Sequence, residues 1–253
     1  MIGIIGGTGT ESLLETYPIT SETEIKTKYG TSPKISILEI DNKEVAYIPR
    51  HSEGHSVPPH KINYRANIEA LKTINVNQIY ATNSVGSLDT NIEPGSILIP
   101  DNFIDFTHDR ISTFFDDEVV HIDCTNPYCE SLRNILNESG ETHPYGIYIA
   151  TEGPRFETGA EIQFYKLIGG KVVGMTGVPE VVLAKERQIC YSSICTVTNY
   201  AASISPNKLT ITEVLDAMKD CEEKLIQLIT KTIEKTNPKR DCECQHILDD
   251  AII

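Results

Sequence analysis

Polar residues follow four apolar runs of the sequence, at the points where buried strands would end. The runs cover residues 2–5, 45–48, 78–82 and 172–173. In an open α/β sheet, ligands collect at the carboxyl ends of the strands, so the side chains that follow these runs are expected to converge on one oxyanion. The predicted anion site contains Thr8, Arg50, Asn83, Ser84 and Thr176.

The glycine turn at residues 6–9 matches neither of two common nucleotide motifs. A dinucleotide fingerprint would need a third glycine where Ser12 stands, and no lysine follows as a P-loop requires. The turn can aim backbone N–H groups and the Thr8 hydroxyl at an anion, or it can simply end a strand. Both interpretations stay open at this level.

Arg50 is the stronger indication of an anion site. An arginine at the end of a buried strand is costly, and in an acidic protein it favours a planar fork that binds an anion. A structural ion pair is the alternative. His51 and His55 follow in a loop before two prolines, so the two-histidine helix face of a metalloprotease is not available, and the seven cysteines lack the paired CxxC spacing of a zinc site. We therefore predict no metal site.

An aromatic residue and two hydrogen-bonding groups follow later strands. Phe156 and Glu157 come after the run at residues 145–150, and Asn199 ends the run at residues 189–198. Phe156 can stack on a planar ring or pack in a core. A lone asparagine at a strand end is usually a turn or cap residue.

The elements that position these residues alternate between strands and helices. Apolar periodicity predicts further strands at residues 35–40 and 97–99, the first forming a hairpin with residues 45–48, and helices near residues 62–71, 127–136, 159–167, 179–187 and 211–233. This order predicts a single α/β domain over residues 1–253, with a central mixed, mostly parallel sheet flanked by helices and a polar Cys-x-Cys tail from about residue 239.

Charge and hydropathy exclude several classes of protein. There are 22 basic and 36 acidic residues, a net charge of −14, which disfavours binding to nucleic acid or to anionic membranes. No apolar run reaches the roughly 20 residues of a membrane span, and the first residues lack a signal peptide, so a cytoplasmic location is expected.

Six segments together resemble the trimeric purine nucleoside phosphorylase family, and more closely its methylthioadenosine phosphorylase branch. They are GGTG at residues 6–9, RH at 50–51 with His55, NYRANI at 63–68, GSL at 86–88, EGPRFE at 152–157 and MTGVPEVVLAKE at 175–186. The resemblance implies attack of inorganic phosphate on C1′ of a purine nucleoside, with phosphate as co-substrate and no cofactor. It also implies a homotrimer or a dimer of trimers.

The resemblance assigns roles to individual residues. It adds His51 to the predicted phosphate site, places Met175 under the ribose and Phe156 on the purine, and adds His55 and Ala201 to the substrate site. His121 matches a residue that reaches the site of the neighbouring subunit. Asn83 and Ser84 depart from the branch, which has Thr and Ala there, so their side-chain roles stay open.

The specificity positions predict a 6-oxopurine. The methylthioadenosine branch has Ser and Asp where this chain has Glu157 and Asn199, and a second Asp where it has Ala201. Asn199 can donate to O6 and Glu157 can accept from N1–H, whereas adenine would leave Glu157 facing an acceptor, at about 1–3 kcal/mol per buried unsatisfied group. Hypoxanthine or guanine is therefore the expected base.

Residues at the start of the last helix predict the substituent at the 5′ position of the sugar. Related ribonucleoside phosphorylases have a histidine near its start, where this chain has Ile211, with Val214 and Leu215 on the same face. An apolar wall favours a thioether, so S-methyl-5′-thioinosine is the expected substrate and inosine and guanosine slower ones. An adenine-releasing methylthioadenosine phosphorylase and a general inosine and guanosine phosphorylase remain alternatives.

The cysteines allow several states. Cys242 and Cys244 can be oxidised, reduced, or part of a mobile tail; a cytosolic origin favours thiols. Heat-stable members of the family use cysteines in such tails, which implies a disulfide there, and Cys129 with Cys195 is a second candidate pair.

Overall fold

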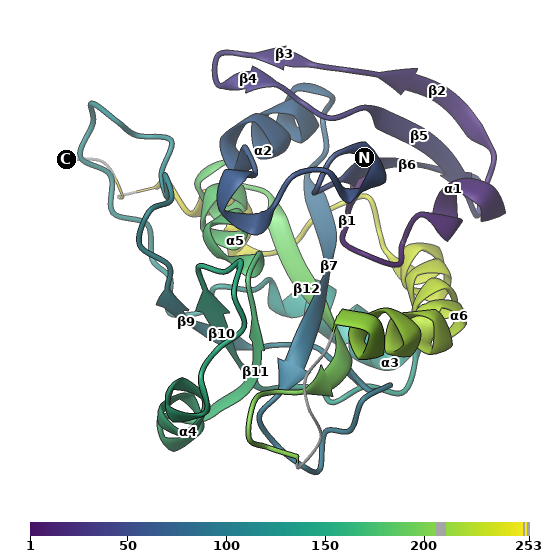
Figure 1. Ribbon diagram of the computed structural model, residues 1–253. Helices are drawn as coiled ribbons and strands as arrows, with labels where there is room; N and C mark the ends of the chain where they lie inside the picture. Colours follow the sequence, from purple (N-terminus) through teal and green to yellow (C-terminus); the bar gives the residue numbers. More distant parts are fainter. Residues whose placement is uncertain (206–210, 250, 252–253) are drawn as a thin grey trace.

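Ten strands form one mixed sheet through the part of the chain that the structure describes (Figure 1). This computed structural model describes residues 1–205, 211–249 and 251, without the side chains of residues 211–218 and 220. The strand order is β2-β5-β6-β1-β7-β11-β10-β9, and β12 pairs with β7 and β8. The sheet confirms the predicted α/β class.

The larger half of the sheet is mostly parallel. Its strands β6 (Lys43–Pro49), β1 (Ile2–Gly6), β7 (Gln78–Ser87) and β12 (Cys190–Tyr200) run side by side in one direction. The predicted hairpin is present, because β5 (Ile35–Ile40) pairs antiparallel with β6. Two short antiparallel strands extend this half, β2 (Ile19–Thr23) on β5 and β8 (Ile97–Leu98) on β12.

The smaller half of the sheet joins the larger half through an antiparallel pair of strands. Strands β11 (Gly170–Gly174), β10 (Ile147–Thr151) and β9 (Asn102–Phe106) are parallel to one another. β11 pairs antiparallel with the last residues of β7, through Val172 with Ser87 and Val173 with Gly86. The carboxyl ends of the two halves therefore face each other across this junction.

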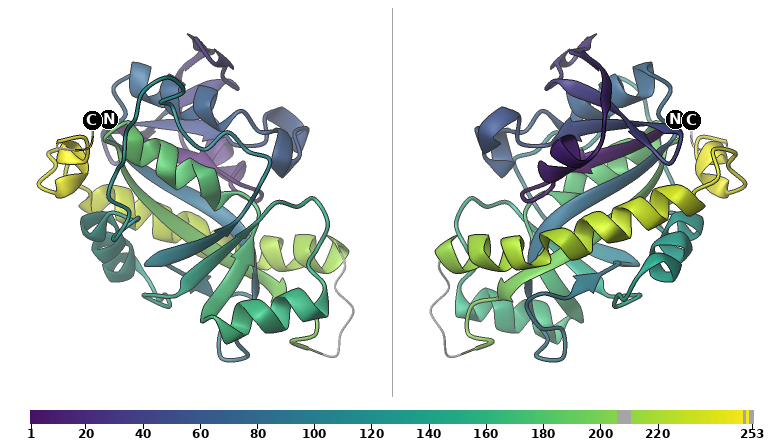
Figure 2. Two further views of the ribbon diagram at one scale, coloured as in Figure 1. Left: turned by 90° about the vertical axis from the view of Figure 1, so that its left-hand side faces the viewer. Right: turned by 90° about the vertical axis from the view of Figure 1, so that its right-hand side faces the viewer.

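Helices cover both faces of the sheet (Figure 2). On one face, α2 (Tyr64–Thr73) and α5 (Gly177–Glu186) pack on each other and share a core with inward residues of β1, β7 and β12. On the other, α3 (Glu130–Ser139) packs on α6 (Ile211–Lys235) over a second core. Successive residues of β12 enter different cores, because side chains along a strand point to opposite faces of the sheet. Ile194 lies in the second core and Cys195 in the first.

Smaller elements complete the description. Helix α4 (Gly159–Leu167) covers the smaller half of the sheet, and α1 (Ser12–Thr16) follows the first strand. The strands β3 (Lys26–Thr27) and β4 (Gly30–Thr31) form a separate hairpin, and short 3-10 helices span Glu53–His55, Pro59–Lys61 and Glu243–His246. Among the described helices, none is long and apolar enough to cross a membrane.

The largest difference from the sequence prediction is the length of β7. We expected a strand at residues 78–82 closed by a polar loop, but the strand continues to Ser87. Pairing with β12 along its whole length holds these small polar residues in extended backbone. The strands β2 and β9 were missed, since β2 is exposed throughout and β9 has no fully buried residue.

Candidate active site

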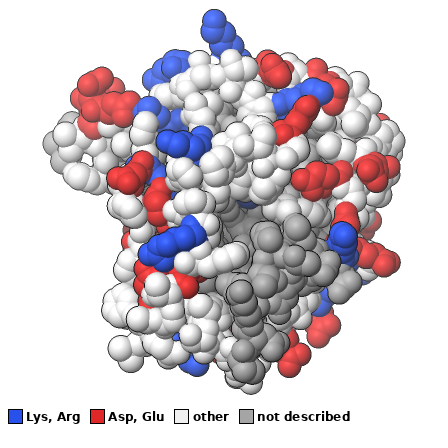
Figure 3. Space-filling view, in the orientation of Figure 1, with Lys and Arg blue, Asp and Glu red and all other residues white. Residues whose placement is uncertain are grey.

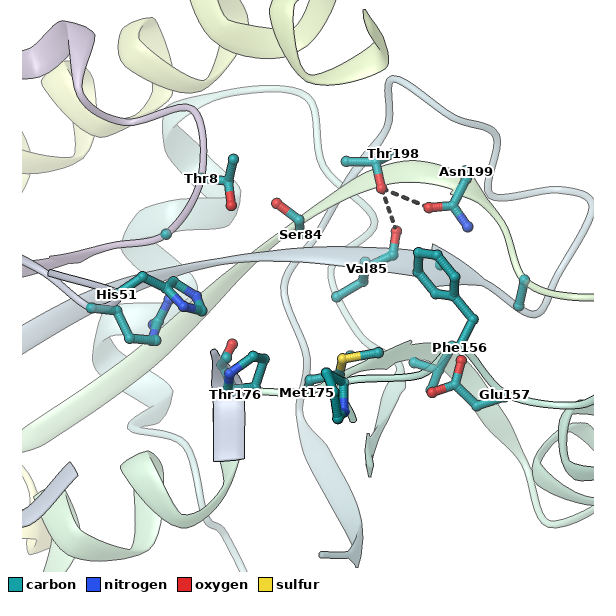
Figure 4. Close-up of a pocket in the computed structure, with 18 of the residues that line it drawn as sticks. Thr8, His51, Ser84, Val85, Phe156, Glu157, Met175, Thr176, Thr198 and Asn199 are labelled. Carbon is teal, nitrogen blue, oxygen red and sulfur yellow. Dashed lines mark hydrogen bonds between the residues drawn. The ribbon is translucent and has the colours of Figure 1, made fainter. Parts of the chain in front are cut away.

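A cavity of about 250 Å³ lies where the two halves of the sheet meet (Figure 4). Its lining comes from the ends of β1, β6, β7, β10, β11 and β12, which is the predicted convergence of strand ends. Figure 4 shows Thr8, His51, Ser84 and Thr176 toward one end, Phe156, Glu157 and Asn199 toward the other, and Met175 between them. We name these the anion end and the ring end.

The glycine turn at the anion end lies directly against β7. The backbone N–H of Gly7 donates to the Thr82 hydroxyl at 2.8 Å. A Cβ on Gly7 would come within 2.7 Å of the Thr82 carbonyl oxygen, so only glycine permits this approach. The turn therefore presents Thr8 to the cavity from a fixed position.

Arg50 lines the anion end and is also held by a buried ion pair. Its Nε and Nη2 donate to the two carboxylate oxygens of Glu180, each at 2.7 Å, and Nη1 donates to the Thr82 carbonyl at 2.6 Å. The Arg50 side chain is 1% exposed and that of Glu180 is fully buried. A guanidinium carries five N–H donors. Three of the five are used in these bonds, and two remain. The structural ion pair given as the alternative is therefore present, and Arg50 still has N–H donors for an anion.

His51 is a neutral hydrogen-bond acceptor in this arrangement. Its Nδ1 lies 2.8 Å from the Val57 carbonyl oxygen, and a carbonyl can only accept, so Nδ1 carries the proton. Burial, together with the nearby Arg50 and His55, lowers the pKa of His51 to about 4, although the hydrogen bond to the Val57 carbonyl opposes this shift. Nε2 therefore presents a lone pair, suited to the O–H of a hydrogen phosphate or of a sugar.

Asn83 does not line the cavity, contrary to the prediction. Its Oδ1 accepts from the Thr176 hydroxyl at 2.8 Å and its Nδ2 donates to the Ser193 hydroxyl at 2.7 Å. Because successive residues of a strand face opposite sides, Ser84 lines the cavity and Asn83 lies behind it. Asn83 thus positions Thr176 instead of meeting a ligand.

The ring end is more open than the anion end. Phe156 is 43% exposed and turns one edge of the cavity into an aromatic wall. Glu157 accepts a hydrogen bond from the Thr151 hydroxyl at 2.8 Å. Burial raises the pKa of Glu157, which that hydrogen bond partly offsets. The Thr151 hydroxyl therefore holds the carboxylate in place.

A bulge in β12 aims Asn199 into the cavity. Val197 pairs with Val85 and Asn199 with Gly86, so Thr198 is an extra residue in the ladder. The amide nitrogen of Asn199 is identified by its 2.9 Å bond to the Tyr200 carbonyl, and Oδ1 accepts from the Thr198 hydroxyl at 2.7 Å. The second amide hydrogen is left for a ligand. Ala201 lines the wall beside it, where its methyl leaves space.

Arg110 is a functional residue that the sequence gave no reason to select. Its Nη1 donates to the carbonyls of Met175 and Val178, each at 2.7 Å, and its Nη2 to that of Glu152 at 2.7 Å. It therefore joins the loops after β10 and β11 that carry Phe156 and Met175. No strand pattern precedes it that could have revealed these contacts.

The remaining predicted site residues differ in their position relative to the cavity. His55 reaches the lining and stacks on His51 with ring centroids 4.0 Å apart. His121, in contrast, is exposed and outside it, and its backbone N–H donates to the Ala251 carbonyl at 2.9 Å. The side chains of Ile211, Val214 and Leu215 lie outside the described residues.

The cysteines differ from both predicted disulfides. No disulfide joins the cysteines of the described residues. Cys195 lies in the first core and Cys129 in the second, on opposite faces of the sheet, so the Cys129–Cys195 pairing is wrong. Cys242 and Cys244 instead meet Cys129 and Cys190, with all four sulfur atoms within 4.8 Å of one another. The spacing argument missed this group because it unites three distant segments.

The surface charges match the acidic composition. On the face shown in Figure 3, Lys and Arg side chains are scattered among Asp and Glu side chains. The cationic group lining the cavity is Arg50, which is fully enclosed. Among the described residues on this face, no extended basic surface leads to the cavity, so the charge that the cavity offers an anion is that of Arg50.

Comparisons with known proteins agree with this geometry. A family model described as the phosphorylase superfamily matches residues 1–234. The chain is 51% identical over 251 residues to a probable S-methyl-5′-thioinosine phosphorylase of Methanothermobacter thermautotrophicus, covering 99% of this chain and 90% of that protein. It is 49% identical over 259 residues to a probable 6-oxopurine nucleoside phosphorylase of Dictyoglomus turgidum, covering 98% and 96%.

A solved structure gives the same result for the fold. The methylthioadenosine phosphorylase from Schistosoma mansoni in complex with adenine superimposes with a TM-score of 0.92 at 26% identity. The match covers 99% of this chain and 98% of that chain.

Proposed function

The chain belongs to the phosphorylase superfamily, and on that basis we propose that it cleaves 6-oxopurine nucleosides with inorganic phosphate. The products are the free base and a pentose 1-phosphate. The observation that carries the proposal is the pairing, in one cavity, of an anion end with a ring end that offers an amide donor and a carboxylate acceptor. Relatives named for S-methyl-5′-thioinosine and for 6-oxopurine nucleosides support the choice of base.

Phosphate binds at the anion end in this proposal. Thr8, Ser84 and Thr176 offer polar groups, Arg50 supplies positive charge, and Nε2 of His51 accepts from the phosphate O–H. A phosphate oxygen then attacks C1′ while the bond from C1′ to the purine nitrogen breaks. Positive charge builds on the ribose beside the phosphate dianion, which lowers the barrier electrostatically. No cofactor takes part, and phosphate is a co-substrate.

The purine leaves at the ring end. The electron pair of the broken bond moves onto the base, where the remaining N–H of Asn199 Nδ2 stabilises it. Glu157 accepts from N1–H of a 6-oxopurine, and Phe156 packs on the ring. Adenine has a lone pair at N1 and would face the Glu157 carboxylate with no hydrogen between them.

For the sugar we propose a methylthio group at the 5′ position. Support comes from the name of the relative at 51% identity and from Ile211, where related ribonucleoside phosphorylases have histidine. Inosine and guanosine are slower substrates in this proposal, because an apolar wall leaves a 5′ hydroxyl without a partner.

The deciding experiment is a base-release assay on four nucleosides. Methylthioinosine, methylthioadenosine, inosine and guanosine are each incubated with and without phosphate. Release of hypoxanthine from methylthioinosine only when phosphate is present supports the proposal. Faster cleavage of methylthioadenosine would instead identify an adenine-releasing phosphorylase, and base release without phosphate would identify a hydrolase.

The proposal includes a homotrimer or a dimer of trimers. His121 lies outside the cavity of its own chain and is exposed, as a residue that completes a neighbouring site must be. Light scattering combined with assay of the separated species tests this. A fully active monomer would exclude a shared site.

A further inference from the structure

Four cysteine thiols meet on the face of the sheet opposite α5. Cys129 precedes α3, Cys190 begins β12, and Cys242 and Cys244 belong to the tail. All four sulfur atoms lie within 4.8 Å of one another, and Cys190 and Cys242 are 3.2 Å apart. Cys129 and Cys190 are buried in the second core, and the two tail residues pack against it.

The sulfur–sulfur distances span the value expected for a tetrahedral metal site, from 3.2 Å for Cys190 and Cys242 to the 4.8 Å limit of the group. Four sulfurs at about 2.3 Å from a central zinc ion lie about 3.8 Å from one another. The closest pair given above, at 3.2 Å, is well beyond the about 2.05 Å of a disulfide bond. The four sulfur atoms are therefore close enough together for one thiophilic ion to reach all of them after small side-chain adjustments.

We propose that Cys129, Cys190, Cys242 and Cys244 bind one zinc ion. The four thiols lose their protons to solvent, and each thiolate donates one electron pair to the ion. Because all four positions are filled by protein sulfur, none remains for water or substrate, and the site is structural. It lies in the second core, apart from the cavity residues described above.

A zinc ion at this place would fasten the tail to the rest of the domain. Among the described residues beyond Pro238, the tail forms a short 3-10 helix, and two side-chain hydrogen bonds join it to the segment just before β12. Gln188 Nε2 donates to the Gln245 carbonyl at 2.7 Å, and Arg240 Nη1 donates to the Gln188 carbonyl at 2.6 Å. A zinc ion would add four bonds that join the tail to α3 and β12, which is far stronger than these contacts.

Metal analysis of the full-length protein tests the proposal. The protein is purified without oxygen and its zinc content measured by inductively coupled plasma mass spectrometry. We expect about one zinc per chain, and a tetrahedral cobalt–thiolate spectrum after exchange with cobalt(II). Cys244→Ser and Cys129→Ser should each lower the bound zinc at least tenfold. Cys124→Ser and Cys195→Ala change cysteines outside the group and should keep it.

A second experiment separates loss of zinc from failure to fold. The double variant Cys242→Ser with Cys244→Ser alters only the tail, and its circular dichroism spectrum reports the fold. With zinc lost, limited proteolysis should cut the tail after about residue 239 faster than in the unmodified chain.

Two results would overturn the proposal. One is that the reduced, metal-free protein takes up no zinc in competition with a chelating dye. The other is that acid-quenched protein from cells contains the four cysteines as two disulfides.

Discussion

The two ends of the cavity are built in opposite ways. At the anion end, Arg50 is 1% exposed and its charge is balanced by Glu180, which in turn accepts from the Tyr191 hydroxyl at 2.8 Å. At the ring end, Phe156 is 43% exposed, and Glu157 has no cationic partner among its hydrogen bonds. The anion end is part of the protein core, whereas the ring end is a set of side chains on its rim.

This difference indicates that base preference can change without a change in stability, whereas phosphate binding cannot. Replacing a member of the anion end leaves a charge or a donor buried without its partner, so stability and activity fall together. Replacing a member of the ring end alters the hydrogen bonds offered to a base and leaves the core intact. The following substitutions test that distinction, in order of decreasing effect.

The largest effect is expected for Glu180→Gln. It leaves the Arg50 guanidinium buried without a counter-charge, which costs about 3–5 kcal/mol when one partner of a buried pair is removed. Urea denaturation measures the free energy of unfolding. Glu161→Gln is the matched control, because its partner Arg155 is exposed, and it should leave the denaturation midpoint nearly unchanged. Equal effects of the two variants would show that the anion end is not part of the core.

The double substitution Asn199→Asp with Glu157→Ser should reverse the base preference without loss of stability. It presents an acceptor to a 6-amino group and removes the carboxylate opposite N1. At about 1–3 kcal/mol per unsatisfied group, the ratio of kcat/KM for methylthioadenosine to that for methylthioinosine should rise about 10- to 100-fold or more. The KM for phosphate should stay constant. A large change in that KM would contradict the independence of the two ends.

A smaller effect is expected for Thr151→Val. The Thr151 hydroxyl donates to Glu157 and thereby lowers the pKa of a carboxyl that burial raises. Without it the pKa of Glu157 rises further, and protonation removes the acceptor for N1–H. The acid limb of the kcat/KM profile for methylthioinosine should therefore move to higher pH. Glu157→Gln should remove this limb, and a limb unchanged in both variants would assign it to another group.

The smallest effect concerns stability at acid pH. The pKa of His51 is about 4 in the folded protein, below the about 6.5 of an unfolded histidine. As the pH falls from about 6.5 to 4, the unfolded chain binds a proton that the folded protein does not, so folding stability decreases. His51→Asn should make the free energy of unfolding less dependent on pH in this window. An identical slope in both proteins would mean that His51 titrates normally.

The anion end was largely visible in the sequence, and the ring end only through resemblance. Thr8, Arg50 and Thr176 stand directly after apolar runs, and the ends of parallel strands must meet at one edge of a sheet. Glu157 and Asn199 were selected because family members vary there, since a lone asparagine after a strand has no distinctive pattern. The bulge that aims Asn199 depends on register with β7, which local sequence does not determine.

The errors in the predicted site also arise from contacts that are distant in the sequence. Asn83 was assigned to the cavity because β7 was expected to end before it. In the strand as it continues, successive side chains face opposite sides, so Ser84 lines the cavity and Asn83 lies behind it. Arg110 and the four clustered cysteines take their positions from contacts across more than forty residues, which no local periodicity reports. Long-range pairing is what the sequence pattern leaves undetermined.

The antiparallel junction between β7 and β11 links the two ends of the cavity. Each end of the cavity contains residues from both sides of the junction. At the anion end Ser84 lies on β7 and Thr176 follows β11, and at the ring end Asn199 lies on β12 and Glu157 follows β10. Any shift of one half of the sheet against the other therefore disturbs both ends at once. Under the proposed function, a phosphate bound at the anion end would restrain that shift and so prepare the ring end for the nucleoside. Because such coupling is reciprocal, the factor by which phosphate tightens nucleoside binding equals the factor by which the nucleoside tightens phosphate binding.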